Sequence, residues 1–465
     1  MLFYIVSVVI IIVVVYILLL TIPFVNHKSV NKHVKNTFYA SDCYSDYTGS
    51  ERVMPILDYE MSMEINLRIL NEAKERIIIS TYKVMSDDAG KDFMAAVIEA
   101  ADRGVKVEFI VNGINEFLNL RENKYIQAFA RQENISMYIY NKVSLLKPWK
   151  IQAALHSKYV IVDNTFYTMG GRNIFNLFMG DYGDYHNKDS EALVYEEGDI
   201  EGTSFEELLD YHKATRKLKD VVKYNIRPDS EEIAKACVEL IVRRNYLREK
   251  YPKVYKSFNW HDNTYATNKL TLLTTSVEAI NKEPILWFKL GELAKSGKDV
   301  SIYTPYIING NEMYKDLYDL VENTDRVQIV TNAVINGANP FGCSDYMNQK
   351  RKILDTGVEL YEYSGEFSTH MKAYVIDNRM TVLGSSNMDM RSVYLDTELM
   401  LAIDSKDINE IVKDDFKKTL TYCSKVTKDG VDFYNENYIH KEMKPVKRII
   451  YQCMRVIVRG TRRFL

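Results

Sequence analysis

One short motif occurs twice in this chain of 465 residues, and the repetition constrains the fold more than any other feature of the sequence. In each copy a histidine is followed by a lysine two residues later, then by an aspartate, and then by a glycine-rich element that ends in asparagine. The two copies consist of His156, Lys158, Asp163 and Asn173, and of His370, Lys372, Asp377 and Asn387. All four identities recur at a constant offset of 214 residues, although the chain has only eight histidines. A duplicated structural hairpin is the alternative explanation, but repeated polar identities in register favour two copies of one functional unit.

The segments around the motif alternate between strand-like runs and amphipathic helices. The first half shows a strand at residues 76–80, a helix at 90–101 and a strand at 105–111. The second half shows helices at residues 285–296 and 313–321 and strands at 300–303 and 327–331. This order is typical of βαβ units. Because no Gly/Pro/Ser-rich linker separates the halves, the repeat itself sets the predicted domains, residues 55–225 and 226–430.

The N-terminus has a different character from the rest. From Leu2 to Val25 there is no charged side chain, and about 20 apolar residues suffice for a helix to cross the hydrocarbon core of a bilayer. A cleaved signal peptide and a buried core helix are the alternatives, but the cationic start, the cleavage site and the polar stripe that they require are absent. We predict a membrane anchor at residues 1–25 and a linker at 26–54. Lysines follow the anchor and none precedes it, which favours the two domains on the cytoplasmic side of the cell membrane.

The C-terminus is strongly basic. Residues 441–465 hold eight Lys or Arg against one Glu, and after Pro445 these cations interleave with apolar residues. The pattern predicts an amphipathic tail, residues 431–465, that lies on an anionic lipid surface. An ordinary packed terminal helix with a solvated basic face is the alternative.

The charge balance argues against a dedicated nucleic-acid binder. The chain has 60 Lys and Arg against 63 Asp and Glu, a net charge of −3, so the core outside the basic tail is acidic. No nucleic-acid partner is therefore expected. The five cysteines are far apart in the sequence and form no C-x-x-C pair, which favours a reducing compartment over a disulfide framework or a zinc site.

The spacing within the motif indicates a site for a phosphate. A histidine and a lysine two residues apart on a strand point to the same face, and glycine lets the backbone carrying the asparagine approach closely. One histidine can attack phosphorus while a second protonates the departing oxygen, and lysines with amides can stabilise the other oxygens. Neither half supplies both histidines, so we expect one site between two halves related by a pseudo-twofold axis. Predicted phosphate-binding residues are Asn173, Ser385 and Asn387.

An acidic triplet follows each motif, and one of its members is expected to orient a histidine. The triplets are Asp189-Ser190-Glu191 and Asp396-Thr397-Glu398. A carboxylate hydrogen-bonded to the far nitrogen of an imidazole fixes its tautomer and raises its basicity. In the second half the candidate is Glu398. In the first half Asp189 and Glu191 both remain candidates, and a solvated acid at a strand end is the alternative for each.

These residues resemble the phospholipase D superfamily, whose signature is H-x-K-x4-D followed by G-[GS]-x-N, twice. The resemblance covers residues 55–425 and is closest to bacterial cardiolipin synthases, with support from the segments 101–105, 303–307 and 384–392. It implies an α/β fold: two pseudo-symmetric phospholipase D-type βαβ sandwich domains with one active site at their interface, plus an N-terminal transmembrane helix. It also implies that Asp189, not Glu191, is the orienting carboxylate, whereas the internal repeat favours Glu191.

The resemblance further implies transfer of a phosphatidyl group through a phosphohistidine intermediate, with cardiolipin and glycerol made from two phosphatidylglycerol molecules. The catalytic set would be His156, Lys158, Asp163, His370, Lys372 and Asp377, with His156 as nucleophile and His370 as general acid and then base, although the symmetry lets either histidine serve. No metal or cofactor is expected, and the partners are a phospholipid substrate and the membrane. A lipid hydrolase that releases phosphatidic acid is the first alternative; a nuclease or a membrane scaffold comes next.

Overall fold

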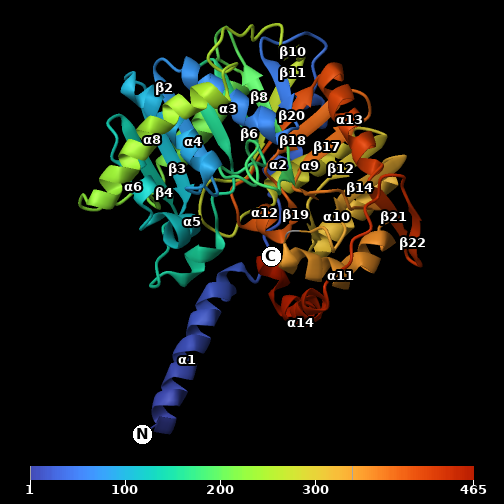
Figure 1. Ribbon diagram of the computed structural model, residues 1–465. Helices are drawn as coiled ribbons and strands as arrows, with labels where there is room; N and C mark the ends of the chain where they lie inside the picture. Colours follow the sequence, from blue (N-terminus) through green and yellow to red (C-terminus); the bar gives the residue numbers. More distant parts are fainter. Residues whose placement is uncertain (1, 338) are drawn as a thin grey trace.

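Two mixed β-sheets form the centre of the protein, shown as a computed structural model in Figure 1. The structure describes residues 2–337 and 339–465. In this part of the chain each sheet has nine strands. The first sheet, in spatial order, contains β10 (Tyr265–Ala266), β1 (Arg52–Ile56), β8 (Glu191–Tyr195), β6 (Phe166–Gly170), β5 (Tyr159–Val162), β2 (Arg76–Thr81), β3 (Lys106–Asn112), β4 (Ile135–Tyr140) and β9 (Val221–Lys223).

The second sheet repeats this arrangement. In spatial order it contains β11 (Lys269–Thr274), β20 (Leu399–Asp404), β18 (Met380–Gly384), β17 (Ala373–Ile376), β12 (Asp299–Tyr303), β14 (Arg326–Asn332), β15 (Glu359–Tyr363), β21 (Cys423–Thr427) and β22 (Gly430–Tyr434). In both sheets three central strands run parallel, β2-β3-β4 and β12-β14-β15, and the motif hairpins β5-β6 and β17-β18 pair antiparallel beside them. The predicted α/β fold with two similar halves is thereby confirmed.

Helices cover the sheets, and side-chain caps fix where several of them begin. Asp58, Asp87 and Thr203 each accept a hydrogen bond from a backbone N–H in the first turn of the following helix. The α-helices are α1 (Leu2–Thr21), α2 (Lys32–Thr37), α3 (Tyr59–Glu72), α4 (Asp88–Asp102), α5 (Gly113–Asn115), α6 (Lys124–Ala130), α7 (Ser204–Arg216), α8 (Glu231–Lys250), α9 (Ile285–Lys295), α10 (Asn311–Asn323), α11 (Pro340–Asp355), α12 (Met390–Tyr394), α13 (Lys406–Leu420) and α14 (Pro445–Thr461). Short helical turns are η1 (Ile22–Phe24), η2 (Ala40–Cys43), η3 (Glu116–Leu120), η4 (Pro148–Gln152) and η5 (Arg462–Phe464).

The two halves share one apolar core at their interface. Each sheet has its own core on the outer side, and a third cluster combines buried residues of both sheets with residues of α7 and α13. Tyr159 and Ala192 of the first half lie in this cluster with Leu272 and Leu401 of the second. Burial of this much apolar surface between the halves favours one rigid unit over two independently moving domains.

Short strands also link the halves beside the two histidines. The segment ahead of His370, β16 (Ser368–Thr369), pairs in parallel with β7 (Asn187–Lys188) of the first half. The segment ahead of His156 forms an isolated bridge between Leu155 and Thr397 of the second half. A further pair, β13 (Ile307–Ile308) with β19 (Met388–Asp389), lies within the second half. Each histidine is therefore held by backbone contacts to the opposite half.

The boundary between the halves differs from the predicted position at residues 225 and 226. Helix α8 packs on α4 and α6, its apolar side chains join the first core, and that core continues to Trp260. Strand β10 then pairs with β1, and the second sheet begins only at β11. The tail likewise starts later than residue 431, because β22 is an edge strand of the second sheet. The amino-acid composition does not change at either boundary. Helix α8 extends the helical layer of the first half, and strand β22 extends the second sheet.

Helix α1 projects away from the two halves (Figure 1), and none of its membrane-length window is buried. In the described residues one helix is long and apolar enough to cross a membrane, Tyr4–Phe24, with a mean hydropathy of 3.4. The chain beyond it is fixed on the second half, because Phe24 is buried in the second core and His27 stacks on Tyr394 at 3.9 Å between ring centroids. The apolar helix is consistent with the predicted anchor.

Candidate active site

The two histidine motifs lie at corresponding places, immediately ahead of β5 and β17. Both lysines are buried, whereas the imidazole side chains of His156 and His370 are 12% and 19% exposed. Lys158 Nζ donates to the carbonyl oxygen of His156 at 2.6 Å, and Lys372 Nζ lies 2.7 Å from His370 Nδ1 and 3.1 Å from its Nε2. The structure thus places the amine of Lys372 directly beside the imidazole of His370 and the amine of Lys158 on the backbone carbonyl of His156, both in an environment from which most water is excluded.

Each histidine takes its carboxylate from the opposite half. His156 Nδ1 lies 2.8 Å from Glu398 Oε1, and His370 Nδ1 lies 2.6 Å from Asp189 Oδ2. Both carboxylates are fully buried. Because Nδ1 faces the carboxylate in each ring, Nε2 is the nitrogen directed away from that carboxylate and toward a substrate, and in His370 it lies 3.1 Å from Lys372 Nζ. The site is therefore reciprocal, and each half contributes to the reactivity of the other.

Glu398 is held by two serines of its own half. Ser392 Oγ donates to Oε1 at 2.6 Å, and the hydroxyl of Ser385 donates to Oε2. Ser385 also accepts a hydrogen bond from the backbone N–H of Leu399. In this geometry the hydroxyl of Ser385 orients the carboxylate behind His156, and the prediction that Ser385 binds phosphate stays a prediction.

Asp189 is held by backbone instead. Its Oδ1 accepts the N–H of Ser190 at 2.8 Å, and Gly171 packs so closely that a Cβ at that position would lie 2.3 Å from the same oxygen. Gly171 occupies the position in its hairpin that Ser385 occupies in the other, one residue after the end of β6 and β18 respectively. The smaller aspartate beside a glycine and the larger glutamate beside a serine thus occupy corresponding positions in the two halves.

The sheet register decides between Asp189 and Glu191. Glu191 pairs with Gly170, and the residue that pairs with the corresponding Gly384 is Met400. Asp189, two residues before Glu191, therefore corresponds to Glu398, two residues before Met400. Glu191 contacts neither histidine, since its carboxylate accepts a hydrogen bond from Ser62 at 2.5 Å. The assignment favoured by the acidic triplets is wrong, because the triplets are out of structural register by two residues.

The two motif aspartates bind backbone N–H groups and stabilise the hairpins that carry the motifs. Asp163 lies beyond β5, in a left-handed turn with φ of 53°, and its carboxylate accepts the backbone N–H groups of Lys74, Glu75 and Arg76 at 2.8–2.9 Å. Asp377 has φ of 51° and accepts those of Lys298 and Asp299. Both therefore fasten the end of the hairpin away from the histidine, and the prediction that they belong to the catalytic set is corrected.

The two asparagines are differently engaged. Asn173 Oδ1 accepts the backbone N–H of Lys83 at 3.1 Å, which directs its amide nitrogen elsewhere. Asn387 is 5% exposed, and its Oδ1 has no hydrogen-bond partner among the described residues. A buried amide oxygen without a partner is costly, so a hydroxyl group of a ligand that donates a hydrogen bond would satisfy it.

Burial controls the protonation of the four basic groups. It lowers the pKa of His156 well below its ordinary value and that of His370 to about 4, with the neighbouring lysines adding to the effect. It also lowers the pKa of Lys158 to about 7 and that of Lys372 to about 8. In the absence of an anion, the imidazoles are therefore neutral and poised as nucleophile or base near neutral pH, while the lysines titrate close to it.

The two carboxylates differ in charge. Burial alone would raise the pKa of Asp189, but Lys372 and His370 outweigh it and hold that pKa below its ordinary value. Burial raises the pKa of Glu398 to about 7, despite the opposing effect of Lys158. Asp189 therefore stays ionised and opposes the burial that lowers the pKa of His370, whereas His156 faces a carboxyl that takes up a proton near neutrality.

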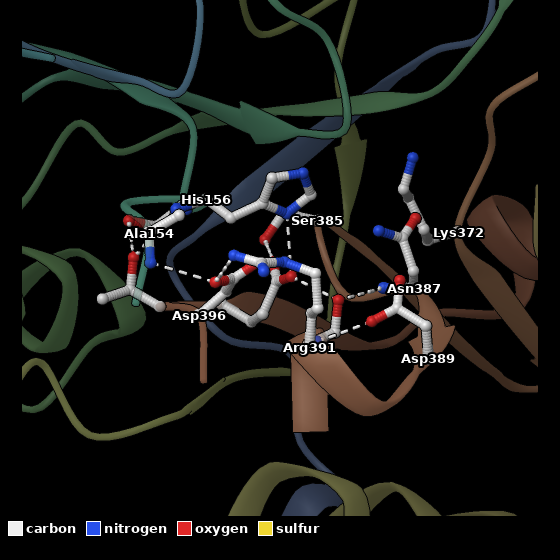
Figure 2. Close-up of polar contacts among 12 residues, drawn as sticks. Ala154, His156, Lys372, Ser385, Asn387, Asp389, Arg391 and Asp396 are labelled. Carbon is white, nitrogen blue, oxygen red and sulfur yellow. Dashed lines mark hydrogen bonds and ion pairs between the residues drawn. The ribbon is translucent and has the colours of Figure 1, made fainter. Parts of the chain in front are cut away.

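Several residues of the site escaped the sequence analysis. Aromatic rings contact both imidazoles edge-on: Tyr82 lies 5.3 Å from His156 and Phe178 lies 5.0 Å from His370, between ring centroids. Arg391 Nη2 donates to the carbonyl oxygen of Gln152 at 2.8 Å and pairs with Asp396, which caps the N–H of Ala154 (Figure 2). Gln152 and Ala154 lie far from Arg391 and Asp396 in the sequence, so no local pattern predicts these contacts. The one local signal for Arg391 is its place shortly after Asn387 in the second motif.

Comparisons with known proteins agree with this arrangement. Residues 67–187 and 290–420 match the family described as the PLD-like domain of cardiolipin synthase. The two matched segments together make up more than half of the chain, and each contains one histidine motif. They also coincide with the central strands of the two sheets.

Individual relatives are distant in sequence. A cardiolipin synthase of Clostridium perfringens is 24% identical over 425 residues, covering 88% of this chain and 78% of the relative. Cardiolipin synthase C of Escherichia coli is 21% identical and covers 79% of this chain and 84% of the relative. The crystal structure of a phosphatidylserine synthase from Haemophilus influenzae superposes with a TM-score of 0.62 at 13% identity, covering 93% of this chain and all of that one. This last similarity concerns the fold.

Proposed function

This chain belongs to the family defined by the PLD-like domain of cardiolipin synthase, and on that premise we propose that it is a membrane-bound phosphatidyltransferase. It would make cardiolipin from two phosphatidylglycerol molecules and release glycerol. The observation that carries the proposal is the pair of imidazoles, each with Nδ1 bound to a buried carboxylate of the opposite half and each followed two residues later by a buried lysine. Such a set suits displacement at a phosphodiester.

In the first step, His156 Nε2 attacks phosphorus and forms a P–N bond, while the bond from phosphorus to the glycerol oxygen breaks. His370 donates a proton to that oxygen, and glycerol leaves. Lys158, Lys372 and the amides of Asn173 and Asn387 stabilise the negative oxygens on phosphorus. The ionised Asp189 supports the acid role of His370, because it stabilises the imidazolium that must exist before the proton is given up.

In the second step, the neutral His370 removes the proton from a glycerol hydroxyl of a second phosphatidylglycerol. The resulting oxygen attacks phosphorus, the P–N bond breaks, and His156 is regenerated. Transfer to lipid requires that the acceptor hydroxyl reach the intermediate in place of water. The N-terminal apolar helix supports this, since it would hold the site close to a bilayer in which the acceptor is concentrated.

The reaction is tested by product analysis. We expect the purified full-length protein, in vesicles containing phosphatidylglycerol, to form cardiolipin and glycerol in equal amounts, measured by mass spectrometry and an enzymatic glycerol assay. The double variant His156→Asn with His370→Asn is the control for contaminating activity. Phosphatidic acid as the main product would replace the proposed transferase with a hydrolase, and a folded protein that forms neither product would refute both.

A pH dependence of substrate affinity follows from the two lysines. Each is charged only below its pKa, about 7 for Lys158 and about 8 for Lys372 in the empty site, so above these values binding an anion requires uptake of a proton. We expect KM to be lowest near pH 6 and to rise between pH 7 and 9, by up to about tenfold per pH unit for each lysine that must be protonated.

The measurement is KM for phosphatidylglycerol from pH 6 to pH 9 at fixed vesicle composition. Competitive inhibition by sulfate is the second readout, because the charge of sulfate does not change in this range. His370 must also take up a proton before the first step, which affects turnover, so the sulfate inhibition constant is the readout that isolates the lysines. An inhibition constant for sulfate that stays constant over the range would contradict the prediction.

A further inference from the structure

The C-terminal helix α14 exposes an apolar face. Val446, Ile449 and Val456 are 68%, 64% and 68% exposed, and Ile450 and Ile457 are 50% and 59% exposed. Cys453 is exposed on the same helix. Spacings of three, four and seven residues place these side chains on one stripe of the helix. A helix on the surface of a soluble domain normally turns such a stripe toward the core.

This orientation is fixed by a second stripe, which packs on the protein. Tyr451 and Val458 are buried, and Arg455 Nε donates to Asn348 Oδ1 at 2.9 Å on α11. Beyond the helix, Arg462 forms an ion pair of 2.6 Å with the buried Asp345. The apolar stripe therefore faces outward because the opposite side is held by specific contacts. Arg448 and Arg459 lie between the two stripes and give the helix a cationic edge.

Helix α14 lies at the end of the molecule from which α1 projects (Figure 1). Arg463 Nη1 donates to the carbonyl oxygen of Val25 at 2.6 Å, which ties the residues after α14 to those after α1. A second apolar feature adjoins the same place, since Leu145 and Leu146 are 71% and 90% exposed in the loop that leads into η4, and η4 contacts α1.

We infer that the stripe of α14 and the loop at Leu145 and Leu146 form, with α1, one surface that docks on an anionic lipid bilayer. The apolar stripe enters the region between headgroups and acyl chains, and the arginine edge contacts acidic headgroups. Continuity with a helix of membrane-spanning length selects a bilayer as the occupant. The consequence is that the two halves are held in one orientation on the membrane, whereas a single flexible anchor would leave them free to rotate.

The chain carries its own probe for this surface. Cys453 lies within the stripe, Cys43, Cys343 and Cys423 are buried, and the half-buried Cys237 is removed by Cys237→Ser. An environment-sensitive fluorophore on Cys453 of the full-length protein, in vesicles of phosphatidylglycerol and phosphatidylcholine, should shift its emission to the blue. It should be quenched by nitroxide-labelled acyl chains and protected from iodide. The readout contains no catalytic step, so it is independent of the proposed reaction.

A matched control lies on α8, where Val238 and Val242 are exposed to 60% and 59% on another part of the first half. The same fluorophore on Val238→Cys, in a chain with Cys237→Ser and Cys453→Ser, should be quenched by iodide and not by the nitroxide lipid. If the label on Cys453 behaves like this control, the surface is solvated and the inference fails. Protection of Cys453 from both quenchers would show a protein partner or a second copy and would also overturn it.

Charge and apolar contact can then be separated with paired variants. Ile449→Glu with Ile457→Glu should abolish nitroxide quenching at Cys453, whereas Val238→Glu with Val242→Glu should leave it unchanged. Thermal unfolding should be the same in both, because all four side chains are exposed. Arg448→Glu with Arg459→Glu should weaken quenching in anionic vesicles and have no effect in neutral ones. Equal quenching in all three variants would contradict the inference.

Discussion

Replacement of either histidine by asparagine is expected to reduce turnover of phosphatidylglycerol by about 10³-fold or more, with the fold retained. Asparagine is polar and smaller than histidine, and it can still hydrogen-bond to the buried carboxylate, but it provides neither a nucleophile nor a proton donor. The measurement is kcat by cardiolipin formation, with circular dichroism and the unfolding midpoint as controls for the fold. Substantial turnover in either variant would contradict a mechanism with two essential histidines.

The double variant sharpens this result. If both imidazoles act in the same reaction, replacing the second should lower kcat only slightly once the first has been replaced, because the reaction is already blocked. We therefore expect His156→Asn with His370→Asn to be no more than slightly slower than either single variant. Two independent losses that multiply would indicate that the histidines contribute separately.

The roles of the two histidines can be distinguished with an activated substrate. A phosphatidyl ester of p-nitrophenol has a leaving group that departs without protonation, so it makes the general acid unnecessary in the first step. We expect His370→Asn to release a burst of nitrophenol close to one per site and to accumulate a phosphatidyl group on His156, detected by mass spectrometry after quenching. His156→Asn should give no burst. The opposite pattern would exchange the two roles.

Asp189→Asn is expected to reduce turnover of phosphatidylglycerol by about 10² to 10⁴-fold. The side chain is fully buried, and its Oδ2 lies 2.6 Å from His370 Nδ1, so an amide there no longer stabilises the imidazolium and also alters the tautomer. Glu191→Gln is the matched control. That carboxylate lies two residues away, is also buried and contacts Ser62, so the variant should retain most of the activity.

Because each carboxylate contacts the histidine of the opposite half, each carboxylate variant should resemble the variant of that histidine. With the nitrophenyl substrate, Asp189→Asn should behave like His370→Asn and keep its burst, although Asp189 belongs to the first half. Glu398→Gln should behave like His156→Asn and slow the burst, since Glu398 Oε1 lies 2.8 Å from His156 Nδ1. If each carboxylate variant instead matched the histidine of its own half, the crossed pairing would be wrong.

The sequence was sufficient to predict the large features of this protein. The helices and strands expected around both motifs are present, because apolar runs such as Ile77 to Ile79 and capping residues such as Asp87 encode them locally. The single site between the halves also followed from simple reasoning, since each half has one histidine of the pair. The structure brings each histidine together with a carboxylate of the other half.

Other features depended on contacts that no local pattern encodes. The choice of Asp189 over Glu191 rests on the register of β6 with β8. Residues two apart on a strand point to the same face of the sheet. The alternation of buried and exposed residues in the sequence therefore cannot distinguish Asp189 from Glu191. The place of Asp163 depends on a left-handed turn that fastens the chain ahead of β2. Ser385 resembled a phosphate ligand because a hydroxyl suits both a phosphate and a carboxylate.

The crossed pairing has a consequence for the synthesis of the chain. The carboxylate that orients His156 is 242 residues further on, and Glu398 reaches it only when the strands of the second half are in place. A chain still on the ribosome, or one cut short by a premature stop, therefore contains a histidine without the partner that fixes its tautomer. The apolar helix precedes both motifs in the chain, so under the proposed function an unfinished chain that already carries this helix would lack the partner it needs to cleave a lipid.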